Sequence, residues 1–306
     1  MRDRTQFLLL IVALVLAPVL GRPVIAAEIL AFAITAVANN MLLGYTGMLS
    51  FGQATFFGVG GYVAGLMMVH WNAPLWLALA GAAGGCALLA AAIGAVCVQR
   101  VGLYFIMLTF AFNQMFYFIA YSWSSLTGGE DGLAGIGRPA WLRDELRFYI
   151  LVAVLFLLSL AAMKRIVDSS WGRLFRAVRD NPDRAAATGH DVRRLKLLSF
   201  VIAGGFTGLA GALYGLVYGI VPIDSIHWLR SGDIVFMTLI GGSGNFFGPV
   251  IGAAFYIWLS ETVSLFWDRW PMILGIVFAL VVLFLRGGIV EILTRLAGLA
   301  KRRAAA

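Results

Sequence analysis

The feature that most constrains this chain of 306 residues is a series of apolar runs, several of which reach the length of a membrane crossing. A helix needs roughly 20 apolar residues to span a hydrocarbon core of about 30 Å. Charged residues make up 12% of the chain and hydrophobic residues 61%, so little interrupts these runs. We therefore expect an all-α, polytopic membrane protein with about 8–10 transmembrane helices, because a soluble core would not need such runs.

The runs give ten candidate helices, which we expect to form one transmembrane domain over residues 1–306. The first has the charged head and short apolar body of a signal peptide, but further spans follow it, so we interpret it as an uncleaved helix. The candidates are 6–20, 24–43, 51–70, 75–98, 101–121, 148–163, 197–220, 233–242, 247–263 and 271–285.

One candidate is too short to cross a bilayer. The run 233–242 has about ten residues, and we expect a re-entrant half-helix that turns at "GGSGN" and returns through 247–263. Irregular backbone is tolerated at membrane depth only where protein buries it or where it lines a wet cavity, so this hairpin is predicted to be a pathway element. In "AGGFTGLAGALYGLVYG", Gly204 and Gly208 lie four apart, as do Gly211, Gly215 and Gly219, and this spacing predicts helix contact faces.

Basic residues predict the orientation of the chain. Nine of the 23 lysines and arginines lie between Lys164 and Lys196, and others lie at Arg2, Arg4 and in the tail at 286–306. The positive-inside rule places all three segments in the cytoplasm and 122–147 outside, although Arg138, Arg143 and Arg147 run against it. The formal net charge of +8 does not indicate a nucleic-acid partner, because the basic residues fall between the apolar runs and form no single basic face.

The polar segment 164–196 contains two predicted helices. From Asp168 to Asp180, Trp171, Leu174, Phe175 and Val178 fall on one face of an amphipathic helix. In "NPDRAAATG", Asp180 or Asn181 suits an N-cap, Pro182 the first turn and Gly189 the C′ position. So short a helix needs a partner surface. The alternative is a solvated topological loop lying on anionic membrane lipid.

Four motifs together resemble a known family: "NNMLLGYTGMLSFGQATFFGVGGYVAGL", "LTGGEDGLAG", "GRLFRAVRDNPDRAAATGHDVRRLKLLSF" and "LIGGSGNFFGPVIGA". They resemble the inner-membrane permeases of branched-chain amino acid ABC importers, of the LivM type. The resemblance covers nearly the whole chain. It implies a multi-pass protein of the bacterial inner membrane that works with a second, homologous permease subunit, two ABC ATPase subunits and a periplasmic substrate-binding protein.

The same resemblance implies that the polar segment docks on the ATPase subunits and transmits their motion. The residues carried over to that role are Arg176, Arg179, Asp180, Asn181, Asp183, Arg184, Ala186, Ala187 and Gly189. A phosphate-binding loop needs a glycine followed by lysine, and no lysine here follows a glycine. We therefore expect that this chain binds no cofactor and is not an enzyme, with ATP and magnesium held by the partner subunits.

Polar groups within the apolar runs are the candidates for a substrate pathway. The amides and hydroxyl are Asn39, Asn40, Gln53, Thr55 and Asn113, and the turn glycines are Gly44, Gly47, Gly241, Gly242 and Gly244. Each polar residue has an alternative interpretation, as a hydrogen-bonding link between helices. The two glycine-rich turns also resemble each other, which suggests an inverted repeat.

Other functions remain open. An ion-coupled secondary carrier usually places ionisable residues near the bilayer centre, whereas Glu28, Asp233 and Glu261 fall near predicted span ends. An enzyme would need a nucleophile, base or metal cluster, and His70, His190 and His227 are isolated in or beside loops. Within the resembling family, urea or amide transport is the alternative to amino acid transport.

The orientation can be tested by labelling single cysteines from outside intact cells, in a background without Cys86 and Cys97. We expect a cysteine at position 130 to be modified and one at position 184 to be protected, because the first lies in the predicted external loop and the second in the basic segment. External labelling at 184 would overturn the whole topology.

Overall fold

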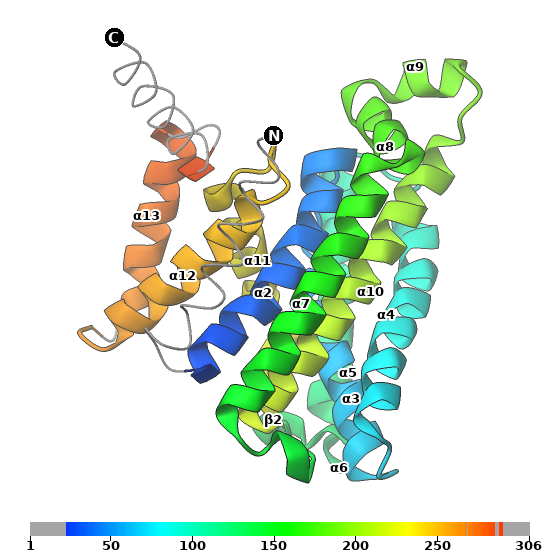
Figure 1. Cartoon of the computed structure of the whole chain (residues 1–306). Helices are drawn as coiled ribbons and strands as arrows, with labels where there is room; N and C mark the ends of the chain where they lie inside the picture. Colours follow the sequence, from blue (N-terminus) through cyan, green and yellow to red (C-terminus); the bar gives the residue numbers. More distant parts are fainter. Residues whose placement is uncertain (1–22, 268, 285–287, 290–306) are drawn as a thin grey trace.

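The computed structural model describes residues 23–267, 269–284 and 288–289, and these residues are mainly helical (Figure 1). The predicted helix 6–20, Arg2, Arg4 and most of the predicted tail at 286–306 lie outside the described residues. Two short strands, β1 (Leu133–Ala134) and β2 (Ile220–Val221), pair antiparallel. The all-α prediction is confirmed for the described part of the chain.

The predicted apolar runs coincide with helices. The longer ones are α2 (Pro23–Asn40), α3 (Gln53–Val69), α4 (Leu75–Cys97), α5 (Leu103–Ser122), α7 (Glu145–Asp168), α10 (Val192–Tyr218), α11 (Trp228–Gly241), α12 (Gly248–Ser264) and α13 (Trp270–Phe284). Within the described residues, five helical segments are long and apolar enough to cross a membrane: α2 with its continuation to Thr46, α4, α5, α7 and α10. The remaining four helices have 17 residues or fewer.

Short elements connect these helices. A π-helical turn, η1 (Met41–Thr46), continues α2. The connection from α5 to α7 contains α6 (Ser124–Thr127), η2 (Gly129–Asp131), β1 and η3 (Ala140–Leu142). The polar segment contains α8 (Ser170–Asp180) and α9 (Pro182–Ala187), and η4 (Ile223–Ser225) precedes α11. These connections define two ends of the bundle, which we call the α9 end and the β1–β2 end (Figure 1).

Several helices begin before the predicted apolar runs, and side-chain caps explain two of these starts. Helix α7 extends beyond the predicted 148–163 because Asp144 caps its start, accepting a hydrogen bond from the Leu146 amide. Helix α10 begins at Val192 and not at 197, because the Asp191 carboxylate accepts from the Arg194 amide at 3.1 Å. Much of the basic segment is therefore helical: five of its basic residues lie on the polar ends of α7 and α10, and the other four lie on the helices between them.

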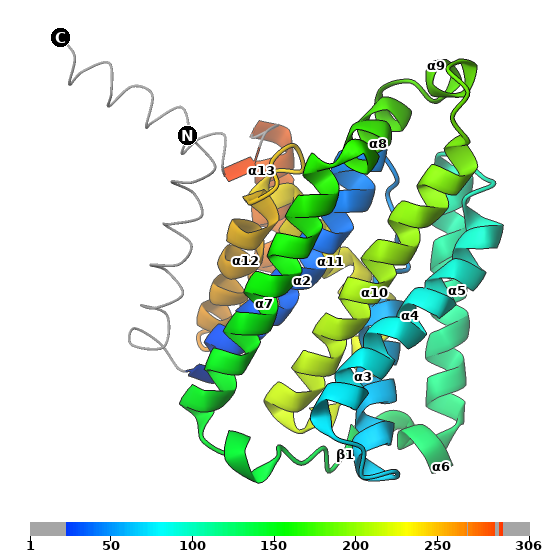
Figure 2. The ribbon, with the colours of Figure 1, turned by 45° about the vertical axis from the view of Figure 1, so that its right-hand side comes forward.

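Helix α10 lies at the centre of the bundle and packs against α2, α3 and α4 (Figure 2). A Cβ on Gly211 would lie 1.7 Å from the Phe57 carbonyl oxygen, and one on Gly60 would lie 2.2 Å from the Gly208 carbonyl oxygen. These contacts confirm the predicted close-packing face. Gly219 is an exception: it follows α10 with φ of 70° and caps the helix, and its carbonyl accepts a hydrogen bond from the Ile136 amide at 3.1 Å.

Helices α11 and α12 form the predicted hairpin. They pack against each other, and the chain reverses between Gly242 and Phe247. Helix α11 begins at Trp228, five residues before the predicted start, because the His227 side chain accepts a hydrogen bond from the Leu229 amide. Asp233 therefore lies inside a helix and not at its end. Whether the hairpin is re-entrant in the bilayer stays a prediction.

Arg138, which runs against the charge rule, has a structural role in the described loop. Its Nε donates to the Leu216 carbonyl at 2.8 Å and its Nη2 to the Val217 carbonyl, both in the last turn of α10. The guanidinium also lies 4.1 Å from the centre of the Phe148 ring. Burial lowers the pKa of Arg138, but an arginine remains charged in proteins. The Arg138 guanidinium therefore caps the C-terminal end of α10. This role explains a basic residue in the predicted external loop.

We expect Arg138→Ala to lower the stability of the folded chain by about 2 kcal/mol, the scale for hydrogen bonds to a charged group. Thermal unfolding of the purified chain in detergent would measure this. Arg143→Ala, at an exposed position of the same loop, is the matched control and should change stability by less than about 0.5 kcal/mol. Equal midpoints for the two variants would contradict the capping role.

Candidate functional site

The helix predicted within "NPDRAAATG" is present as α9, and it projects from one end of the bundle (Figure 1). Asn181 is its N-cap, with the side-chain Oδ1 accepting from the Arg184 amide at 2.9 Å, and Pro182 occupies the first turn. Gly189 has φ of 86°, as the predicted C′ position requires. The polar segment is therefore an ordered structure built by its own capping residues.

Most of the predicted coupling residues on α9 are exposed. Ala185 is 5% exposed and packs inward, whereas Asp183, Arg184, Ala186, Ala187 and Gly189 lie on the surface. A Cβ added to Gly189 would meet no atom within 4 Å. Helix α9 thus presents a small-residue surface flanked by charges, with no other part of the described chain covering it.

Helix α8 joins α9 to the membrane helices. Phe175 and Val178 are buried, as its amphipathic pattern predicts. Trp171 was predicted on the same face but is 51% exposed, because it lies in the first turn, at the edge of the contact. Asp180 ends the helix and is exposed. The apolar face of α8 therefore anchors the polar segment, while its arginines remain available for other contacts.

Two of those arginines contact the first glycine turn. Arg179 Nη1 donates to the Gly44 carbonyl, and its side chain packs 3.2 Å from the position of a Cβ on Gly47. The Arg176 guanidinium lies 5.8 Å from the centre of the Tyr45 ring. Gly47 has φ of 72° and ends the π-helical turn. The structure thus brings together two sets of residues that the sequence analysis treated separately, the coupling arginines and the pathway glycines.

The first glycine turn in turn contacts the second. A Cβ on Gly44 would lie 2.2 Å from the Ser243 carbonyl oxygen, so the two backbones touch. Asn40 Nδ2 donates to the Asn245 carbonyl at 3.0 Å, and Asn39 Nδ2 donates to Thr238 Oγ1 at 3.0 Å. A continuous series of contacts therefore runs from α8 through η1 to the α11–α12 hairpin.

The three glycines of the second turn differ in their constraints. A Cβ on Gly241 would lie 2.0 Å from the Gly248 carbonyl oxygen, and Gly242 has φ of 108°. Gly244 has neither constraint, because a Cβ there would meet nothing within 4 Å. The first turn is a π-helix and the second a helical hairpin, so the predicted inverted repeat is not reproduced in their local conformation.

The other predicted pathway residues lie near the start of α3, after a buried non-helical segment that follows Gly47. Gln53 Oε1 accepts from Thr207 Oγ1 at 2.9 Å. Asn113 Nδ2 donates to Thr55 Oγ1 at 2.9 Å and to the Ile226 carbonyl at 2.8 Å. All are at most 1% exposed. These bonds link α3 to α5, α10 and the η4 region, which favours the helix-linking interpretation in this isolated chain.

Several of these amides keep an unused atom. Asn39 Oδ1, Asn40 Oδ1, Gln53 Nε2 and Asn113 Oδ1 are buried and have no hydrogen-bond partner within the described ranges. A buried polar atom without a partner costs free energy unless water, a ligand or another conformation satisfies it. The amides are therefore able to bind a further polar group if the helices move apart.

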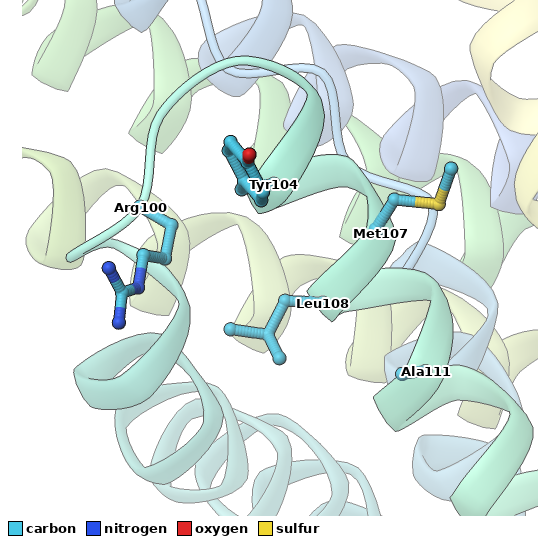
Figure 3. Close-up of a pocket in the computed structure, with 5 residues that line it drawn as sticks. All are labelled: Arg100, Tyr104, Met107, Leu108 and Ala111. Atoms are coloured by element: carbon cyan, nitrogen blue, oxygen red, sulfur yellow. The ribbon is translucent and has the colours of Figure 1, made fainter.

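A surface groove of about 650 Å³ lies elsewhere, at the start of α5. Figure 3 shows its lining by Arg100, Tyr104, Met107, Leu108 and Ala111. It contains none of the predicted pathway residues. In the part of the chain that the structure describes, no group of three or more histidine, cysteine, aspartate or glutamate residues is placed to hold a metal ion.

The sequence is similar to a family of membrane permeases. The family described as "Branched-chain amino acid transport system / permease component" matches residues 24–286. The LivM permease protein of Escherichia coli K12, of the high-affinity branched-chain amino acid transport system, is 24% identical over 278 residues, covering 82% of this chain and 65% of the relative. The chain therefore spans about two thirds of that relative's length, and no solved structure gives a significant match.

Of two further relatives, one again belongs to a high-affinity branched-chain amino acid transport system and the other to a different import system. The LivH permease protein of Salmonella typhimurium is 26% identical over 244 residues, which is 72% of this chain and 78% of the relative. The autoinducer 2 import system permease protein LsrC of an Enterobacter strain is 33% identical over 156 residues, 47% of this chain and 44% of the relative. The similarity thus extends to permeases of more than one named import system.

The different constraints on the glycines of the two turns predict different effects of substitution on stability. Gly44→Ala and Gly242→Val should each destabilise the chain by about 1–3 kcal/mol, because the first forces two backbones apart and the second strains a left-handed residue. Thermal unfolding followed by size-exclusion chromatography in detergent would measure the loss. Gly244→Ala is the control and should be neutral, since its Cβ points into open space. A Gly44→Ala protein as stable as the control would refute the predicted close contact.

Proposed function

Because the chain belongs to the branched-chain amino acid transport permease family, we propose that it is the membrane-spanning permease subunit of an ATP-driven ABC importer. It is a multi-pass membrane protein, and we place it in a bacterial inner membrane. The proposed substrate class is branched-chain or related small amino acids, delivered by a periplasmic binding protein. A second, homologous permease and two ATPase subunits complete the proposed transporter.

The observation that carries this proposal is the connection of α9 to the membrane helices. An exposed, capped helix with small residues on its surface suits a cleft in a partner protein. A loop needed only for topology would not require that its arginines contact the turn of a membrane helix, as Arg179 does at Gly44. Force applied to α9 would reach α2 and the α11–α12 hairpin through this contact. ATP and magnesium would be bound by the ATPase subunits.

Two alternatives lead to different outcomes. An ion-coupled carrier would transport in the absence of ATPase subunits, whereas the proposed permease requires them. The acidic residue most deeply placed in the hairpin, Asp233, is already paired with Arg230 at 3.4 Å, which does not favour a proton-carrying role. A family permease for urea or amides would use the same α9 but a different binding protein, so identifying the ligand of the co-purified binding protein separates it from an amino acid importer.

Replacing Ala186 by Trp tests the coupling role of α9. Added bulk at an exposed alanine should prevent close docking, so the permease should insert in the membrane but retain roughly tenfold less ATPase subunit, equivalent to about 1.4 kcal/mol of docking free energy. Co-purification followed by quantitative blotting would measure the ratio. Substrate-stimulated ATP hydrolysis should fall with it.

Ser125→Trp is the matched control, because it adds the same bulk at an exposed position of the opposite end. It should retain the normal amount of ATPase subunit. If Ala186→Trp also keeps normal ATPase stoichiometry and normal stimulated hydrolysis, α9 is a topological anchor only.

A further inference from the structure

Charged and phenolic side chains of α2, α10, α11 and α12 lie close together. Arg230 and Asp233 lie one turn apart on α11, with the guanidinium Nη1 3.4 Å from a carboxylate oxygen. Tyr256 of α12 donates to the other oxygen of Asp233. Tyr218, at the end of α10, donates to Glu28 of α2 at 2.6 Å. We call these five residues the outer charge cluster.

The two halves of the cluster adjoin each other through α2. The Arg230 guanidinium lies 5.4 Å from the centre of the Phe32 ring, and Phe32 is one turn from Glu28 on the same face of α2. The proposed coupling route does not use these residues. Charged groups within membrane helices are costly to maintain, and they commonly mark a substrate or ion pathway.

Arg230 and Glu28 both have hydrogen-bonding atoms that the described residues do not use. A guanidinium has five N–H donors, and within the described residues only Nη1 of Arg230 has a polar side-chain contact. Glu28 uses Oε2 for Tyr218, while its Oε1 has no hydrogen-bond partner in the described part of the chain. The Arg230 and Asp233 side chains are each 24% exposed, so neither is fully enclosed by the described residues. The cluster thus offers free donors on a cation and a free acceptor on an anion.

Aromatic rings lie beside these charges. The Phe32 ring centre is 5.6 Å from that of Tyr214, and Tyr214 is 5.2 Å from Tyr218. Phe32 and Tyr214 are buried, whereas Tyr218 is 44% exposed and offers apolar ring surface for an aliphatic group and a negative π-face that favours an ammonium group.

We propose that the outer charge cluster binds the zwitterionic form of an aliphatic amino acid, with Arg230 receiving the carboxylate and Glu28 the ammonium group. The aliphatic side chain would lie against the exposed Tyr218 ring. A guanidinium can bind a carboxylate through two parallel hydrogen bonds, which fixes the orientation of the ligand. This inference rests on the proposed function, since it takes the substrate class from there, and it adds a recognition site on the permease itself.

The competing interpretation is a structural network in which the Tyr256–Asp233 bond only holds α12 against α11 and the Tyr218–Glu28 bond only holds α10 against α2. The two interpretations predict different effects of removing Arg230 or Glu28 on the binding of ligands that lack one charged group. A recognition site predicts that losing Arg230 removes affinity for the carboxylate end of a ligand and that losing Glu28 removes affinity for the ammonium end. A structural pair predicts no such selectivity.

The experiment measures binding to the purified full chain in lipid nanodiscs by saturation-transfer NMR at pH 6. The probes are L-leucine, its amide without the carboxylate, and 4-methylpentanoate without the ammonium group. Arg230→Gln should weaken leucine and 4-methylpentanoate roughly tenfold and leave the amide unchanged. Glu28→Gln should weaken leucine and the amide roughly tenfold and leave 4-methylpentanoate unchanged.

Arg143→Gln, at an exposed loop position, is the matched control and should leave all three probes unchanged. If Arg230→Gln fails to fold, Glu28→Gln still tests the ammonium half, because its bond to Tyr218 is at the surface. The proposal is overturned if leucine does not bind the unmodified chain, or if the variants weaken all three probes equally. ATPase subunits that co-purify with the same protein would show that the proposed function survives such a failure.

Discussion

The hydrogen bond from Arg179 to the Gly44 carbonyl joins the polar segment of this protein to its membrane helices. A carbonyl in the last turn of a helix has no partner within the helix, and a cation is favoured there. The π-helical turn η1 places this carbonyl at the α9 end, and the caps of α8 and α9 hold the arginine opposite it. The Arg176 guanidinium, 5.8 Å from the centre of the Tyr45 ring, is a second contact between α8 and η1.

The segment after Gly47 shows how the bundle tolerates irregular backbone. Met48, Ser50 and Gly52 are buried, and the Phe51 amide donates to Thr109 Oγ1 at 3.3 Å. The Ala54 amide, at the start of α3, donates to Ser231 Oγ at 2.9 Å. Side chains of α5 and α11 thus satisfy backbone groups that lipid could not. This requirement explains why hydroxyl and amide side chains occur within otherwise apolar helices.

Elements whose position depends on neighbouring residues in the sequence could be predicted. Apolar runs located the main helices, and Asn181, Pro182 and Gly189 delimited α9. Contacts between distant segments had no such signal. Nothing near Arg138 indicates that it caps α10, and nothing near Glu28 indicates that Arg230, about 200 positions later, lies beside the same face of α2. The candidate coupling residues and turn glycines were individually identifiable, but their contact depends on how α8 packs against η1.

Helices α2 and α11 each connect a residue of the outer charge cluster to one of the two glycine turns. Helix α2 bears Glu28 near one end and continues to Gly44, about 24 Å away at 1.5 Å per residue. Helix α11 bears Arg230 near one end and Gly241 at the other. The Asn39–Thr238 and Asn40–Asn245 hydrogen bonds join the two helices near the glycine turns. A displacement that enters at Arg179 and leaves these bonds intact therefore moves α2 and α11 together, and Glu28 and Arg230 move with them.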